Sequence, residues 1–361
     1  MEQLWTAPYN ELVDFVVSEP DISIGRDVVA IEEGIRPDFY SKFNAVRAAF
    51  LAQNYSGLLD ESYALCTEFM QVKGELSARL GLRDVLMPKE LDRFLTDPFQ
   101  QIIRELFDPL FALLQEKIEA PEFADDVDVH VEEAFHTLYH SGFIKWFVLS
   151  LVKNLGPESV YEVPLPVPSS KQIIKHRDDI RQNVPFPRLT TVMSFEVVRR
   201  AILLVPDFIV RSADLGRYVA FRTAVGRALW RSTYYSEKRE WLSIAEILDR
   251  HGVTELKPHL LVYVGEKLED ISLVADCDQF CRPDLIVYFI GLPDQADVDK
   301  DEQLREIKTA HEILKPHRGT CVITANHLSR PQASGLDPAI RVIKFGFCSQ
   351  NWQSVLALLQ G

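Results

Sequence analysis

Apolar residues recur every three or four positions through the first 160 residues of the chain. Such spacing places apolar side chains on one face of a helix, which can then pack against a neighbouring element. Pro109 falls inside the third apolar stripe and predicts a kink or break there, whereas Gly156 and Pro157 end the fourth stripe. We therefore expect residues 1–162 to form a helical domain. The four stripes cover residues 37–50, 58–80, 99–118 and 130–155.

Proline is frequent in the next stretch, residues 163–190. Because proline has a fixed φ angle and no backbone N–H, this stretch cannot form a continuous helix and favours extended backbone. We expect it to connect two domains, with a short helix near residues 173–180. Its prolines are Pro164, Pro166, Pro168, Pro185 and Pro187.

Short β-branched runs alternate with helical stretches in the remainder, residues 191–361. This alternation predicts an α/β domain with a mixed sheet flanked by helices, so the fold class is α/β with a helical N-terminal domain. The expected strands are 207–212, 217–223, 260–264, 285–290, 320–324 and 342–347. The expected helices are 194–203, 237–251, 301–315 and 351–359.

The composition is typical of a folded protein of two domains. The 361 residues exceed the usual size of one compact core, 47% of them are hydrophobic and 25% are charged. The sequence has no apolar run long enough to cross a bilayer, which needs about 18 residues, and its first residues are acidic, which predicts a cytoplasmic protein without a membrane partner. Five scattered cysteines, an odd number, predict reduced thiols rather than disulfides.

The net charge of −14 conceals a basic segment in the middle of the chain. Residues 171–257 hold 16 basic and 10 acidic side chains, whereas the segments before and after them are acidic. Arginines and aromatic residues are interleaved there, as phosphate pairing and base stacking would require, and also as a protein interface would. The segment is expected to bind a protein or nucleic-acid partner. Its candidate binding residues are Arg211, Arg217, Arg222, Arg227, Trp230 and Arg231.

Within this segment, PDFIVRSADLGRYVAFRT (residues 206–223) reads as two strands joined by a tight turn. The order of predicted elements over residues 194–264, with Pro206-Asp207 at the start of a strand, resembles the core of the PD-(D/E)XK nuclease-like family. The resemblance implies that Asp207 would be a ligand of Mg²⁺, with Glu196 as an additional acid. The family's acid and lysine on the second strand, however, correspond to Phe221 and Thr223, neither of which can replace them.

Two functions therefore remain open. The preferred hypothesis is a non-catalytic binding or accessory subunit without cofactors, which uses a degenerate nuclease-like α/β domain to engage its partner. The alternative is a metal-dependent nuclease with Asp207 and Glu196 as ligands. The sequence leaves open the identity of the partner, the oligomeric state, and whether residues 258–361 form a separate domain.

Three other motifs in the sequence predict neither a metal site nor an activity. Glu133, His136 and His140 share a helical face, but the bundle metal sites that use such a motif need a second copy, which the sequence lacks. Cys277 and Cys281 are spaced more widely than a zinc knuckle and have no second pair, so no zinc site is predicted. Residues 282–327 are similar to the later part of class I methyltransferases without their Gly-rich loop, which indicates shared architecture rather than shared activity.

Overall fold

The protein forms two compact units, each built from two segments of the chain. One contains Met1–Thr67 and Lys89–Gly142, and the other Glu68–Pro88 and Phe143–Gly361. This division differs from the single boundary expected near residue 162, because α3 (Ser56–Leu80) and α7 (Ala120–Asn154) each contribute to both units. The structure is a computed structural model that describes residues 4–26, 28–163, 186–195, 206–223, 241–243, 250, 256–271, 275–276, 279–292, 300–324, 336–347 and 351–360.

The first unit is predominantly helical, as the sequence predicts. It also contains a short antiparallel hairpin, β1 (Ile22–Ile24) with β2 (Val29–Ile31), which the helical pattern did not predict. No helix in the described part of the chain combines the length and apolarity needed to span a bilayer. Besides parts of α3 and α7, the helices of this unit are α1 (Thr6–Ser18), α2 (Arg36–Asn54), α4 (Lys89–Thr96), α5 (Pro98–Ile102), the 3₁₀ helix η1 (Ile103–Leu106) and α6 (Phe107–Leu114).

Aromatic side chains form the interior of the first unit. Phe43 of α2 and Phe111 of α6 have ring centroids 4.6 Å apart, and the Arg47 guanidinium lies 5.1 Å from the centroid of the Phe43 ring. The helical stripe that contains Pro109 is broken at η1, before the proline, and Pro109 lies in the first turn of α6. A proline is tolerated there because first-turn N–H groups have no partner within the helix.

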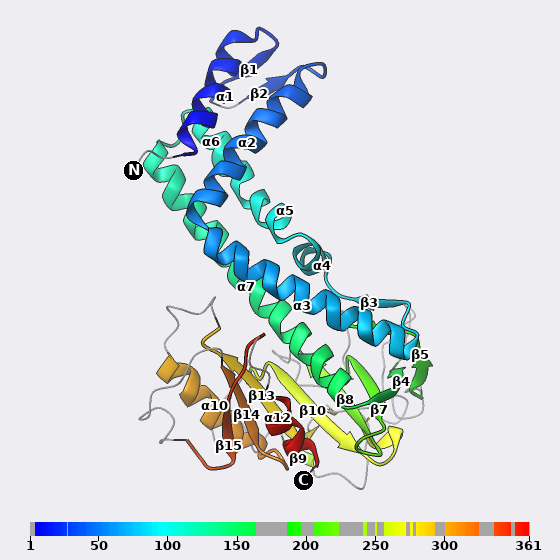
Figure 1. Cartoon of the computed structure of the whole chain (residues 1–361). Coiled ribbons are helices and arrows are strands. Elements are labelled where there is room, and N and C mark those ends of the chain that lie inside the picture. Colours follow the sequence, from blue (N-terminus) through cyan, green and yellow to red (C-terminus); the bar gives the residue numbers. More distant parts are fainter. Residues whose placement is uncertain are drawn as a thin grey trace, which may run out of the picture. The chain divides into compact units, whose positions relative to one another are not determined.

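A mixed sheet organises the second unit (Figure 1). Within the described residues its strand order is β15-β14-β13-β10-β8-β7-β4-β5. β13, β14 and β15 are parallel neighbours, and the other pairs are antiparallel. The strands are β4 (Pro157–Glu162), β5 (Arg188–Thr190), β7 (Phe208–Ser212), β8 (Arg217–Thr223), β10 (Leu260–Gly265), β13 (Leu285–Ile290), β14 (Thr320–Thr324) and β15 (Ile340–Lys344).

Helices pack on both faces of this sheet. On one face, α10 (Lys300–Leu314) buries Ile307 in the same cluster as Tyr288 of β13. On the other face, Phe147 of α7 lies 5.0 Å from Phe289 and 5.1 Å from Trp352 of α12 (Trp352–Gln360), measured between ring centroids. Tyr288 and Phe289 are adjacent, and side chains alternate along a strand, so the two helical layers contact opposite faces. The result is the flanked mixed sheet that the sequence predicts.

Two smaller sheets contain residues that were expected to be helical. Ser194, expected to begin a helix, belongs to β6 (Val192–Ser194), which pairs with β3 (Asp84–Leu86). The helix expected over 237–251 is wrong at 241–243, because β9 (Trp241–Ser243) pairs with β12 (Gln279–Cys281), which in turn pairs with β11 (Ala275–Asp276). In each case pairing with a distant segment overrides local helical preference. The rest of both expected helices lies outside the described residues, except for Phe195 and Arg250, as does the expected helix at 173–180.

Candidate functional site

Asp207 lies directly before β7, as the sequence predicts. Its backbone N–H donates to the Phe221 carbonyl of β8 at 2.8 Å. Phe208 is opposite Phe221 in the ladder, so Asp207 lies opposite Arg222, one residue beyond the β7 terminus. Directly opposite residues in an antiparallel pair share a face of the sheet. The pairing register of β7 and β8 therefore places Asp207 beside Arg222.

Both carboxylate oxygens of Asp207 are engaged. Oδ1 accepts a hydrogen bond from Arg222 Nη1 at 2.9 Å, and Oδ2 accepts from both the backbone N–H and the hydroxyl of Thr223, each at 2.7 Å. The Asp207 side chain is 1% exposed and that of Arg222 10%. A buried carboxylate needs this compensation, because an unpaired charge is strongly disfavoured in the interior. Asp207 is therefore stabilised by an internal ion pair and two further hydrogen bonds.

Lys145 of α7 adds a second buried cation to this network. Its Nζ donates to the Thr223 hydroxyl at 2.9 Å and lies 5.1 Å from the centroid of the Phe195 ring. Burial lowers the pKa of Lys145 to about 8, the negative charge of Asp207 opposes this shift, and the positive charge of Arg222 adds to it. Sequence reasoning missed Lys145, because it is 78 residues from Thr223 along the chain and no local motif includes it.

Among the described residues, Asp207 is not part of a ligand cluster that could hold a divalent cation. Mg²⁺ requires several oxygen ligands, and in the described part of the chain no group of three or more His, Cys, Asp or Glu side chains could hold a metal ion. Phe221, which the resemblance compares with the family's acid, is fully buried and packs against Phe208 at 5.3 Å between ring centroids. Glu196, the additional acid implied by the resemblance, lies outside the described residues.

The arginines expected to bind a partner have different environments. Arg222 is 8% exposed, so the expectation that it lies on a binding surface is wrong: burial beside Asp207 gives it an internal role. Arg211 of β7 is partly exposed; its Nη1 donates to the Gly216 carbonyl at 2.6 Å, and its Nε lies 3.9 Å from Glu158 Oε2. Arg217 is half-buried at the start of β8. The other expected residues, Arg227, Trp230 and Arg231, lie outside the described residues.

Residues of four neighbouring strands form a second candidate site, named here the Tyr-Arg face: Tyr161 of β4, Leu189 of β5, Arg211 of β7 and Tyr218 of β8. The ladder places Arg211 opposite Tyr218, and Tyr161 opposite both Ile209 and Leu189. The sequence pattern did not single out Tyr161, Leu189 or Tyr218. Alternation along each strand shows which residues share a face, but only the pairing register brings the four strands together.

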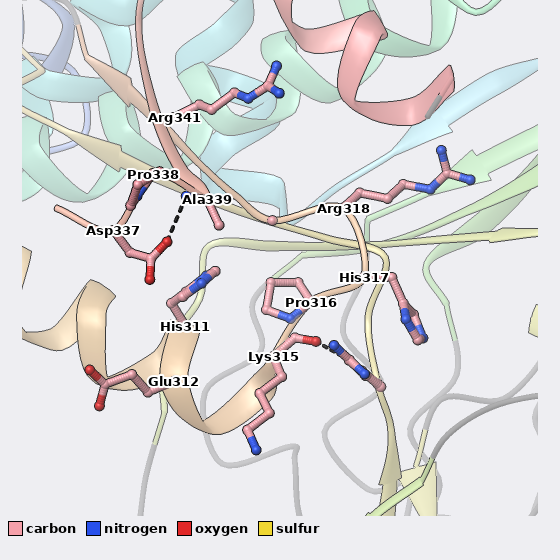
Figure 2. A pocket seen from close by; sticks show the side chains of 12 residues that line it. His311, Glu312, Lys315, Pro316, His317, Arg318, Asp337, Pro338, Ala339 and Arg341 are labelled. Carbon is pink, nitrogen blue, oxygen red and sulfur yellow. Dashed lines mark hydrogen bonds between the residues drawn. The ribbon is translucent and has the colours of Figure 1, made fainter.

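A pocket of about 700 Å³ lies at the amino ends of β14 and β15, beside the C-terminus of α10 (Figure 2). Its charged lining is mostly basic, but those side chains do not converge. Figure 2 shows the side chains of Arg318 and Arg341 extending away from that of Lys315. The residues that line the pocket include Arg282, Lys315, Arg318 and Arg341, with Glu312 and Asp337 as the acids.

Several polar groups of this pocket have structural partners. Arg318 Nη1 donates to the Leu359 carbonyl at 2.7 Å, and Arg282 Nε donates to the Lys315 carbonyl just beyond α10. His311 Nδ1 lies 2.8 Å from the hydroxyl of Thr320, a fully buried residue that no ligand could reach. These contacts hold the loop after α10 in place and give the pocket no reactive pair of groups.

The remaining sequence candidates gain no support as metal sites. Glu133, His136 and His140 all lie on α7, as expected, but form no ligand cluster among the described residues. Cys66, Cys281 and Cys321 are buried free thiols, whereas Cys277 and Cys348 lie outside the described residues. Comparisons of the chain with protein-family models, with curated proteins and with solved structures give no match.

Proposed function

We propose that this protein is a binding or accessory subunit in which a nuclease-like α/β unit has lost metal-dependent catalysis. The observation that carries the proposal is the engagement of both Asp207 oxygens by Arg222 and Thr223. A catalytic Asp must offer an oxygen to the metal ion, and here that would require breaking a buried ion pair or a hydrogen bond. The acid is retained, and its chemical role becomes the stabilisation of the ends of β7 and β8.

The buried lysine is consistent with this role. Lys145 donates to Thr223, whose hydroxyl donates in turn to Asp207, so the three side chains form a hydrogen-bonded chain from α7 to the sheet. Such a chain fixes the helix against the strand ends and orders the adjacent backbone. A binding surface benefits from this rigidity, because less conformational entropy is lost when a partner binds.

A cleavage assay tests the proposal. The purified protein is incubated with single- and double-stranded DNA and RNA in Mg²⁺ or Mn²⁺. We expect no metal-dependent cleavage above that of Asp207→Asn, and no increase in melting temperature on addition of Mn²⁺. Asp214→Asn, which changes an exposed acid in the β7–β8 turn, is the matched control. Cleavage by the wild type and by Asp214→Asn that is lost in a folded Asp207→Asn variant would instead establish the metal-dependent nuclease.

A further inference from the structure

The Tyr-Arg face lies on the same side of the sheet as α10 but at the other end of it. Ile209 of β7, which is opposite Tyr161, belongs to the buried cluster that includes α10 residues such as Ile307. Figure 1 shows α10 alongside β13, β14 and β15, whereas β4 and β5 lie at the far end of the sheet. The buried apolar layer beneath α10 is thus continuous with the Tyr-Arg face, which is half-exposed.

The side chains of this face are stacked and partly accessible. The Arg211 guanidinium lies 4.9 Å from the centroid of the Tyr218 ring, and the rings of Tyr218 and Tyr161 are 5.8 Å apart at an interplanar angle of 74°. Leu189 is 69% exposed, and the Arg211 side chain 31%. Both tyrosines are half-buried and pack against the cluster beneath α10. Their positions are therefore fixed by packing, while part of each side chain remains accessible.

We propose that the Tyr-Arg face binds single-stranded nucleic acid, which makes the unidentified partner of the proposed binding subunit a polynucleotide. Aromatic rings on a sheet stack with bases regardless of sequence, and an arginine beside them pairs with phosphate. Leu189 supplies an apolar surface at the edge strand. The inference rests on the proposed function, because a bound strand here is held and not cut.

Charge favours a polyanion over an acidic or neutral protein as the occupant. Residues 171–257, which contribute three of the four residues of the face, carry 16 basic and 10 acidic side chains in a chain of net charge −14. Arg211 is the arginine of the face itself, because Arg188 and Arg217 directly precede Leu189 and Tyr218 in their strands and therefore point to the opposite side of the sheet. Phosphate binding by Arg211 releases counterions, so the affinity should fall as salt increases.

Fluorescence anisotropy with labelled oligothymidylate and oligouridylate tests the proposal on the full chain. The variant Tyr161→Leu/Tyr218→Leu keeps apolar bulk but removes both aromatic rings, and we expect its Kd to rise about tenfold or more. Arg211→Gln should reduce the slope of log Kd against log salt concentration by about one. Tyr63→Leu, which changes a 47% exposed tyrosine of α3, is the matched control and should bind as the wild type does.

Two results would overturn the inference. One is the absence of binding by the wild type to either oligonucleotide at micromolar concentration in low salt. The other is an unchanged affinity of the Tyr161→Leu/Tyr218→Leu variant for the oligonucleotides while circular dichroism shows its fold intact. If that variant instead failed to bind a protein partner, the face would be a protein interface. Neither result bears on the loss of catalysis, which the cleavage assay decides independently.

Discussion

Arg222 and Asp207 form an ion pair across the ends of β8 and β7, with Nη1 donating to Oδ1 at 2.9 Å. The two residues lie opposite one another in the antiparallel ladder, so the pair closes the hairpin at the end remote from its turn. Both side chains are almost inaccessible to solvent. Asp207, which the resemblance suggested as a metal ligand, is therefore a buried acid that pairs with an arginine inside the protein.

Removing one partner of this ion pair should lower the free energy of unfolding. Arg222→Met leaves the Asp207 charge buried without its counterion, and we expect a loss of about 3 kcal/mol or more in the free energy of unfolding. Asp207→Asn should cost a similar amount, whereas the double variant should cost less than the sum, by at least about 1 kcal/mol. Urea denaturation of the four proteins measures this coupling.

A matched control for this cycle is Arg211→Met. This arginine is on the neighbouring strand, but its side chain is partly exposed and 3.9 Å from Glu158, so its loss should cost less than about 1 kcal/mol. Strictly additive effects of Asp207→Asn and Arg222→Met would show that the two charges do not stabilise one another.

Lys145 should make stability depend on pH in the alkaline range. Its pKa is about 8 in the folded protein against 10.5 as the ordinary value, so between these values the unfolded chain binds more protons than the folded one. Stability should therefore rise with pH from about 8 to 10.5 through this group, by roughly 3 kcal/mol in total. Below pH 8 the lysine is charged in both states, so its destabilising effect is largest and no longer changes with pH.

The difference between the wild type and Lys145→Met isolates this contribution. Buried thiols whose pKa is raised act in the opposite direction in the same range, but they are common to both proteins and cancel in the comparison. Denaturation curves at a series of pH values give the difference directly. If the variant and the wild type change in parallel from pH 8 to 10.5, Lys145 does not titrate as the structure implies.

Gly319 should not tolerate alanine. Its φ angle is +97°, and a Cβ atom would lie 2.5 Å from the Ala339 carbonyl oxygen, which is main chain and cannot rotate away. We expect Gly319→Ala to cost about 2 kcal/mol or more, through backbone strain and steric overlap. Gly216→Ala is the control: it also has a positive φ, +62°, but open space around it, so only about 1 kcal/mol should be lost. Thermal unfolding of both variants compares them, and equal losses would contradict this account.

The buried cysteines should resist thiol reagents in the folded protein. Burial raises the pKa of both Cys66 and Cys321 to about 12, so little of the reactive thiolate exists at neutral pH. Native labelling with an alkylating reagent, followed by peptide mass spectrometry, should leave both residues unmodified, while labelling in urea should modify both. Rapid labelling of either one in the native state would show that its surroundings open readily.

Local sequence pattern sufficed for much of the second unit. The expected strands at 217–223, 285–290 and 320–324 have the observed bounds. Those at 207–212 and 260–264, and the helix at 301–315, agree within a residue. These elements combine a strong period with clear breaks, which local preference alone can specify. The strand expected at 342–347 is Ile340–Lys344, because pairing with β14 sets its position.

Pairing between distant segments decided the rest. Trp241–Ser243 became a strand through β12, and Leu189 and Tyr161 became neighbours through a register that neither strand encodes alone. The sequence by itself determined that Phe221 and Thr223, which the resemblance compares with an acid and a lysine, can act as neither, since side-chain chemistry is fixed by residue type. Only the tertiary structure decided that Arg222 and Thr223 would enclose Asp207 and that Lys145 would join them, because burial of a charge depends on what the whole fold packs around it.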